Sequence, residues 1–180
     1  MTYRNIFAGL VACAVLAASC CNSSCTCEDG YEVPAPEDVV MYQVNPRVFA
    51  PEKSFNAVAE HIDSIKALGT NVVWFMPIYP VGQIKTVNSP YCISDYKGVN
   101  PEFGTLEEFK SLVSLCHQKG MSVIVDWVAN HTSWDSNWME HKEWYTLDEK
   151  GEIVSPANTG WLDVADLNFD NQDMRLAMID

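Results

Sequence analysis

The chain has 180 residues, enough for one domain with a sizeable core, and its hydrophobic content of 48% excludes a disordered or low-complexity protein. Its 24 Asp and Glu residues outnumber its 11 Lys and Arg residues, which gives a formal net charge of -13. Because no basic cluster follows Arg4, this charge argues against nucleic acid and against an anionic membrane surface as partners.

The first residues are typical of an export signal. Arg4 precedes an apolar run over residues 6–18, which is too short to span a bilayer comfortably and indicates a secretory signal. Three small residues before Cys20 resemble a bacterial lipobox. We therefore expect residues 1–19 to be a lipoprotein signal peptide and Cys20 to carry the lipid, with Cys13 as the alternative acceptor. The lipid would anchor the protein to a membrane of the cell envelope, facing the periplasm or the cell exterior, and would be its only membrane contact.

Residues 20–38 are predicted to form a tether or linker between the lipid and the fold, because this segment contains Pro34 and Pro36 and shows no hydrophobic period. The tether also holds four cysteines: Cys20, Cys21, Cys25 and Cys27. A metal or disulfide cluster is the alternative, although no His or carboxylate stands at ligand spacing around these cysteines.

Residues 39–132 predict the order strand, helix, strand, helix, strand. The apolar runs 39–44 and 71–77 predict the first two strands, and residues 55–68 between them have the three- and four-residue apolar spacing of an amphipathic helix. Gly69 is expected to end that helix. Short joints between these elements indicate a βαβ unit with parallel strands. His61 falls on the polar side of the predicted helix, so we expect it to be solvated.

The second predicted helix begins at a capping box, T-x-x-E from Thr105 to Glu108, and buries Cys116 as a small core residue. The β-branched run 121–125 then predicts a third strand buried on both faces. We expect Val123 and Val125 to lie on the inner face of the sheet. On this pattern alone, an open doubly wound sheet and part of a (β/α)8 barrel both fit, but no G-x-G-x-x-G follows a strand, which weakens nucleotide binding.

Two long irregular segments separate these elements. The loop 78–104 is rich in Pro, Gly, Ser and Tyr, and loops of this length in compact domains are usually functional. Residues 133–165 show no period and predict a small inserted subdomain, with aromatic residues that mostly form its own core. Those aromatic residues are Trp134, Trp138, Trp144, Tyr145 and Trp161. Another helix begins near residue 171, and three strands cannot close a barrel, so we expect the chain to be a fragment.

Polar residues follow the third predicted strand directly: Asp126, then Asn130, His131 and Thr132. A carboxylate at the carboxyl end of a buried parallel strand is the usual arrangement of an α/β enzyme, whose sites lie at that end of the sheet. The alternative interpretation is that Asp126 caps the following turn and His131 is an ordinary loop histidine.

Four motifs in order resemble the α-amylase family, glycoside hydrolase family 13. The block D-W-V-A-N-H-T at 126–132 resembles the D-x-V-x-N-H block of the family, and 41–49 is similar to its first strand. Residues 89–105, with Y-C-I-S-D-Y and then F-G-T, resemble its second-strand loop, and A-D-L-N at 165–168 resembles the block that closes its domain B.

The resemblance implies an α/β fold that is the N-terminal part of a (β/α)8 TIM barrel. Residues 39–132 would supply the first three strands of the barrel, 133–168 the inserted domain B, and 169–180 the truncated start of the next barrel helix. The nucleophile and the acid of the family would lie beyond Asp180. Because retaining hydrolysis needs two carboxyl groups about 5–5.5 Å apart, this fragment alone would be inactive.

The resemblance also implies roles for individual residues. Asp126 would be a supporting carboxylate that orients an arginine beside the nucleophile through charge-assisted hydrogen bonds. Tyr91 and His131 would bind the sugar. Asn130 and Asp166 would be calcium ligands, although calcium takes about six to eight oxygens.

The implied function is retaining hydrolysis of α-1,4-glucosidic bonds in starch-like α-glucans or malto-oligosaccharides. Cys92 stands where the α-glucosidases of the family carry Asp, which disfavours action from chain ends, and Ala165 replaces the usual Pro of the domain B block. A family transferase, such as a branching enzyme or glucanotransferase, and a non-catalytic glycan-binding lipoprotein are the alternatives. The sequence gives no indication of an oligomeric state.

Overall fold

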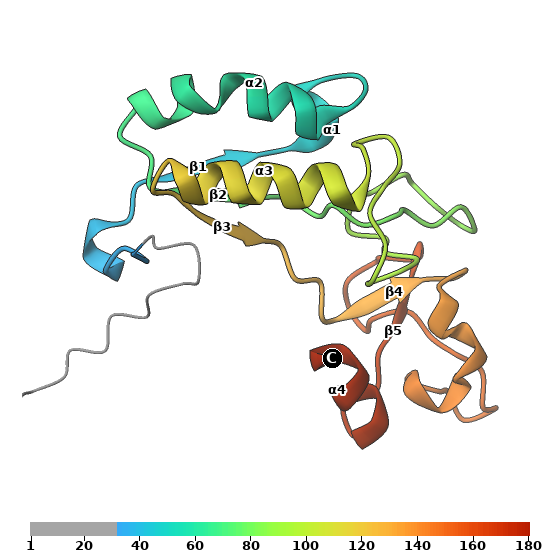
Figure 1. Ribbon diagram of the computed structural model, residues 1–180. Helices are drawn as coiled ribbons and strands as arrows, with labels where there is room; N and C mark the ends of the chain where they lie inside the picture. Colours follow the sequence, from blue (N-terminus) through green and yellow to red (C-terminus); the bar gives the residue numbers. More distant parts are fainter. Residues whose placement is uncertain (1–31) are drawn as a thin grey trace, which may run out of the picture.

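The computed structural model describes residues 32–180 (Figure 1). The predicted signal peptide, the predicted lipidation of Cys20 and residues 20–31 of the predicted tether lie outside the described residues, so these expectations stay predictions. Near the start of the described part lies an exposed 3-10 turn, η1 (Pro36–Asp38). Within residues 32–180, no helix is long and apolar enough to cross a membrane.

A parallel sheet of three strands forms the first layer of the fold, in the order β1-β2-β3. The strands are β1 (Met41–Val44), β2 (Val72–Phe75) and β3 (Ser122–Val125). Two helices, α2 (Ser54–Ala67) and α3 (Leu106–Gln118), pack against each other and cover one face of this sheet (Figure 1). The β-α-β-α-β order predicted from the sequence is therefore confirmed.

Local sequence signals explain where the two helices begin and end. Thr105 and Glu108 form the predicted capping box, with Glu108 Oε2 accepting from Thr105 N at 2.7 Å and Thr105 Oγ1 accepting from Glu108 N at 3.1 Å. The chain turns out of α2 at Gly69, whose φ of 87° lies in the left-handed region that glycine adopts without a steric penalty. His61 is exposed on α2, as its position on the polar face predicted.

The main core lies between the sheet and the two helices. On the strands it includes Val44, Val73 and Phe75, while α2 contributes Phe55 and α3 contributes Leu112. Cys116 also lies in this core and is fully buried, as predicted. The aromatic rings of Phe55 and Phe109 pack with centroids 5.0 Å apart.

Two expectations for β3 were wrong. Val123 and Val125 pack against the helix-side core and not on the opposite, inner face. Successive strand residues alternate between faces, so a phase error of one residue moves every side chain to the other side. The opposite face carries Ser122 and Ile124, and Ile124 is 43% exposed, so β3 is not buried on both faces.

A short helix, α1 (Pro46–Phe49), follows β1 and was not predicted. Pro46 does end the strand, but it also occupies the first turn of this helix, where its missing N–H has no hydrogen bond to lose. The side chain of Asn45 accepts a hydrogen bond from Arg47 N at 3.2 Å and caps the helix.

Residues after β3 build a second, smaller unit around an antiparallel pair of strands, β4 (His131–Ser133) and β5 (Val164–Asp166). Two 3-10 turns, η2 (Asn137–Glu140) and η3 (Lys142–Trp144), lie between them in sequence, and α4 (Gln172–Ile179) follows. Figure 1 shows this unit beyond the end of β3, away from α2. The strand pair was not predicted, because three-residue strands are too short to reveal a period.

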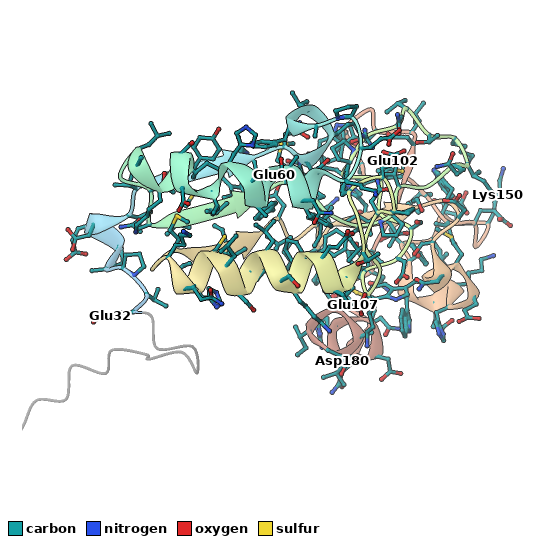
Figure 2. All side chains as sticks on the ribbon, turned by 45° about the horizontal axis from the view of Figure 1, so that its top comes forward. Glu32, Glu60, Glu102, Glu107, Lys150 and Asp180 are labelled. Carbon is teal, nitrogen blue, oxygen red and sulfur yellow. The ribbon has the colours of Figure 1, made fainter. Side chains whose placement is uncertain are left out.

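The smaller unit has its own core, formed by Tyr145, Ala165, Leu167 and Met174. Trp134, Trp138 and Trp144 pack against this core, which confirms that most of the tryptophans serve packing. Trp161 differs, since it is 50% exposed. Charged side chains lie outside both cores, and the labelled residues of Figure 2, among them Glu60, Glu107 and Lys150, are all exposed.

Leu112→Ala should lower the free energy of unfolding by about 2–5 kcal/mol, because it leaves a cavity in the main core. Leu106→Ala, on the same helix but 41% exposed against 2% for Leu112, should cost only about 0.5 kcal/mol. Urea unfolding of the full-length protein that carries this chain measures both. Equal losses in the two variants would contradict the assignment of the core.

Candidate active site

Asp126 lies at the carboxyl end of β3 and is held by two segments far from it in sequence. Its Oδ1 accepts a hydrogen bond from Trp74 Nε1 at 2.8 Å, and its Oδ2 accepts one from the Tyr91 hydroxyl at 2.9 Å. Trp74 belongs to β2 and Tyr91 to the long loop that follows it. The carboxylate therefore joins two strands and a loop, and these contacts differ from those of a local turn cap.

His131 opens β4, is 7% exposed, and is fixed through both ring nitrogens. Its Nε2 lies 3.2 Å from the carbonyl oxygen of Tyr91, and its Nδ1 lies 3.1 Å from Nδ2 of Asn130. Burial lowers the pKa of His131, although the Tyr91 carbonyl and the carboxylates of Asp163 and Asp166 oppose this shift. The contacts match a neutral imidazole that donates from Nε2 and accepts at Nδ1.

Tyr91 connects these two groups, since its hydroxyl donates to Asp126 and its carbonyl accepts from His131. Burial, followed by the hydrogen bond to Asp126, raises the pKa of Tyr91 above its ordinary value. The phenol therefore stays protonated and keeps its role as a donor. The structure thus brings together Asp126, which the family resemblance implies as the supporting carboxylate, and Tyr91 and His131, which it implies as sugar-binding residues.

A cavity of about 440 Å³ opens beside this group. It is lined by Val87, Ser89, Tyr91, His131, Trp161, Asp163 and Val164. The Trp161 ring meets the His131 ring edge-on, with centroids 5.7 Å apart and an interplanar angle of 70°. Apolar faces with a few convergent polar groups are the usual composition of a small-molecule site. We call this cavity the cleft.

Two residues that support the site were missed in the sequence. The Tyr96 hydroxyl lies 2.7 Å from the carbonyl oxygens of both Val128 and His131, and so fixes the loop between β3 and β4. Burial is the main cause of the strongly raised pKa of Tyr96, which keeps the hydroxyl protonated. Tyr96 could have been identified, because it belongs to the D-Y motif of the loop that resembles the family. Trp74 gave none, because a tryptophan within an apolar strand is typical of a core.

Cys92 and Cys116 are the free cysteines among the described residues, and both are buried. Cys92 Sγ lies 3.2 Å from the carbonyl oxygen of Asp163, which it meets as an S–H donor. Burial, reinforced by the carboxylates of Asp163 and Asp135, raises the pKa of Cys92 to about 11. The thiol is therefore neutral, and it supports the wall of the cleft from behind without lining it.

Asn130 and Asp166, the expected calcium ligands, lie close together. His131 pairs with Asp166 across the two strands, and Leu167 N donates to the carbonyl of Asn130 at 3.2 Å. Both side chains offer the hard oxygens that calcium prefers, but calcium takes about six to eight of them. Within residues 32–180, no group of three or more His, Cys, Asp and Glu side chains gathers as a metal site. The two residues fit only part of a site, so no step of the function is assigned to a metal.

Parallel strands that deliver polar residues to their carboxyl end, with a small unit inserted after β3, define part of an α/β-barrel enzyme. The family model "Alpha amylase, catalytic domain" matches residues 51–153. The chain therefore belongs to the α-amylase family, glycoside hydrolase family 13. This confirms the expected fold class, because the similar solved structures are (β/α)8 barrel enzymes.

Several known proteins are similar to this chain. An α-amylase from Lactobacillus plantarum superposes with a TM-score of 0.74 at 39% identity, covering 79% of this chain and 35% of that structure. The α-glucosidase of Apis mellifera is 34% identical over 131 residues, which are 70% of this chain and 21% of that protein. The probable oligo-1,6-glucosidase 2 of Bacillus subtilis is 32% identical over 66% of this chain and 21% of its own length. The chain thus spans about a fifth of these two curated relatives.

Tyr96→Phe should lower the free energy of unfolding by about 1–3 kcal/mol, because it removes the one hydroxyl hydrogen that the carbonyls of Val128 and His131 share. Tyr79→Phe is the matched control, since the Tyr79 ring packs on Tyr96 with centroids 6.0 Å apart and it too loses only a hydroxyl. The free energy of unfolding of this control should lie within about 0.5 kcal/mol of that of the wild type. Thermal or urea unfolding of the full-length protein measures both, and equal effects would show that the hydroxyl of Tyr96 is not an anchor.

Proposed function

We propose that this chain is part of a retaining glycoside hydrolase that cleaves α-1,4-glucosidic bonds in starch-like glucans and malto-oligosaccharides. The observation that carries the proposal is the joint placement of Asp126, Tyr91 and His131 beside the cleft. Family membership supports glycoside chemistry in general, and its similar proteins include amylases, α-glucosidases and oligo-1,6-glucosidases. The choice of the α-1,4 bond is our proposal.

Asp126 is suited to a supporting role next to the reacting bond. Each of its oxygens accepts one hydrogen bond from a neutral donor, Trp74 Nε1 or the Tyr91 hydroxyl, so its orientation is fixed while further lone pairs stay available. A carboxylate fixed in this way can hold a guanidinium by two parallel charge-assisted hydrogen bonds. We propose that it orients an arginine beside a nucleophile supplied by the rest of the barrel.

The cleft offers aromatic rings for stacking and a hydrogen-bond donor, the two kinds of contact that a sugar needs. Tyr91 is 38% exposed and Trp161 50% exposed, so each presents part of an aromatic ring to the cleft. The hydrogen bond from His131 Nε2 to the Tyr91 carbonyl is long, at 3.2 Å, and can be exchanged for one to a sugar hydroxyl. Rings for stacking beside a neutral imidazole donor fit an uncharged ligand that carries hydroxyl groups.

Cys92 favours cleavage inside a glucan chain over removal of its terminal glucose. An Asp at this position would place a charged group behind the wall of the cleft, whereas the neutral thiol is buried against the Asp163 carbonyl. A family transferase would share every residue described here, and the products formed by the full-length protein distinguish the two reactions. A non-catalytic glycan-binding lipoprotein would bind the same ligands without turnover.

Amylose incubated with the full-length protein should lose viscosity early, because internal bonds are cut. Asp126→Asn should lower kcat/KM about 10- to 100-fold, the loss expected when charge-assisted hydrogen bonds worth about 1.5–3 kcal/mol are removed. Glu60→Gln, an exposed change on α2, should leave kcat/KM unchanged. Residues 32–180 alone should give no turnover.

Two outcomes would refute this proposal. Release of glucose alone from chain ends would contradict internal cleavage, and full activity of Asp126→Asn would contradict the role of the carboxylate. Products longer than the starting malto-oligosaccharide would identify a transferase.

We also propose, from the family resemblance, that Asn130 and Asp166 contribute ligands to calcium in the full-length protein. Asp166→Ala should then melt below the wild type in calcium, and the gap should narrow in chelator, because a metal bound only to the native state stabilises it. Asp170→Ala removes an exposed carboxylate nearby and should melt like the wild type in both buffers. An unchanged melting temperature of the wild type in chelator would show that the calcium proposal is wrong.

A further inference from the structure

The two sides of the cleft come from segments that are far apart in sequence. Val87, Ser89 and Tyr91 lie on one side, within residues 82–91, and we call this segment wall A. Trp161, Asp163 and Val164 lie on the other side, within residues 161–164, and we call this segment wall B. The width of the cleft depends on whatever holds these walls in register.

Asp135, in the loop after β4, holds the beginning of wall A. Its Oδ2 accepts hydrogen bonds from Gln83 N at 2.7 Å and Ile84 N at 3.3 Å. Burial favours the protonated form of Asp135, but hydrogen bonding from Gln83 N, the Ser133 side chain and Ile84 N outweighs it, and the pKa of Asp135 is lowered. The group is therefore ionised at neutral pH, and hydrogen bonds from N–H groups to a carboxylate are stronger than those to a neutral acceptor.

Gly82 permits this close approach. A Cβ atom at Gly82 would lie 2.2 Å from Ser133 Cβ and 2.5 Å from Asp135 Oδ1, so no other residue fits without displacing β4 or Asp135. Gly82 N also donates to the carbonyl of Cys92 at 2.8 Å. The first residue of wall A, Gly82, therefore lies in close contact with Ser133 and Asp135 of the smaller unit.

Trp134, the neighbour of Asp135, contacts both walls. Its Nε1 donates to the carbonyl of Leu162 in wall B at 3.0 Å. The ammonium of Lys85 in wall A lies 3.7 Å from the centroid of the Trp134 ring, in the geometry of a cation–π contact. One side chain therefore links the two walls.

Wall A needs this support, because its own contacts are few. Ile84 is 53% exposed and Val87 is 74% exposed, so neither contributes to a core. Lys85 and Asn88 have φ angles of 55° and 62°, a region that costs a non-glycine residue energy unless its surroundings hold it there. The barrel side supplies two further anchors near the other end of wall A: Arg47 Nη1 donates to the carbonyl of Asn88 at 2.6 Å, and Asp126 Oδ2 accepts from the Tyr91 hydroxyl at 2.9 Å.

We infer that Trp134 and Asp135 form a clamp that fixes wall A against wall B and thereby sets the affinity of the cleft for its glucan. Both are positioning residues, since they act through the walls and do not line the cleft. The effect on substrate binding rests on the proposed function, whereas the mechanical effect on wall A does not. Loss of the clamp should raise KM more than it lowers kcat, because the bond from Trp74 to Asp126 stays in place.

The test compares Asp135→Ala with Asp135→Asn in the full-length protein, through amide hydrogen exchange and steady-state kinetics on maltoheptaose. Asp135→Ala should speed exchange of the Gln83 and Ile84 amides about tenfold or more, as expected for loss of hydrogen bonds to a charged group. KM should rise by a similar factor. Asp135→Asn retains an acceptor oxygen, so it should restore most of the protection and most of the affinity.

Asp148→Ala is the matched control. Asp148 Oδ1 accepts from Lys150 N at 2.9 Å and Glu152 N at 2.8 Å, the same kind of contact in a loop away from the cleft. This variant should leave KM and the exchange of residues 83–84 unchanged. Trp134→Phe provides a second test, since it keeps a ring for Lys85 but loses the donor to Leu162, and it should also raise KM.

Unchanged exchange in Asp135→Ala would overturn the clamp. Faster exchange with an unchanged KM would overturn its role in binding. A wild-type protein that neither binds nor turns over maltoheptaose would refute the proposed function, while the exchange of residues 83–84 would still decide whether the clamp exists.

Discussion

The hydrogen bonds of the Asp126 carboxylate are the constraint on which the arrangement of the site depends. Trp74 reaches Oδ1 from β2 and Tyr91 reaches Oδ2 from the loop after it. These bonds form only if β2 and β3 are parallel and in register, as the pairing of Phe75 with Val125 ensures. Packing of the main core thus determines the position of a charged group that lies outside that core.

The barrel part and the smaller unit contribute different residues to the site. The barrel part fixes Asp126, while the smaller unit supplies His131, Trp161 and Asp163 to the cleft. Tyr91 is the link, because it contacts Asp126 through its side chain and His131 through its backbone. His131 as a neutral imidazole and Tyr91 as a protonated phenol add no charge of their own to that of the nearby carboxylates of Asp126 and Asp163.

Much of the fold could be predicted from the sequence, because its signals are local. The helix at 55–68 has a clear apolar period, and the Thr105–Glu108 box marks a helix start within one residue of α3. The phase of β3 could not be predicted, since an apolar residue suits either face of an apolar strand, and Val123 and Val125 were placed on the wrong one. The pairing of β4 with β5 joins segments about 30 residues apart, and no local pattern encodes it.

The candidate site, like the fold, could be predicted only in part from the sequence. Tyr91, Asp126 and His131 stand within motifs, and the structure brings them together. The contributions of Trp74 and Tyr96 depend on which distant group their polar atoms meet, Asp126 in one case and the backbone of the β3–β4 connection in the other. Tertiary placement decides such contacts, so a single sequence does not reveal them.

The separation of Trp134 and Asp135 from the barrel has an evolutionary consequence. Neither residue belongs to the main core, so substitutions there leave the packing around Phe55 and Leu112 intact, and Trp134 packs only against the core of the smaller unit. A lineage could therefore explore new glucan lengths or linkages by altering how wall A is fastened, while the barrel and its carboxylate stay as inherited. Substrate preference can therefore vary while the fold stays the same.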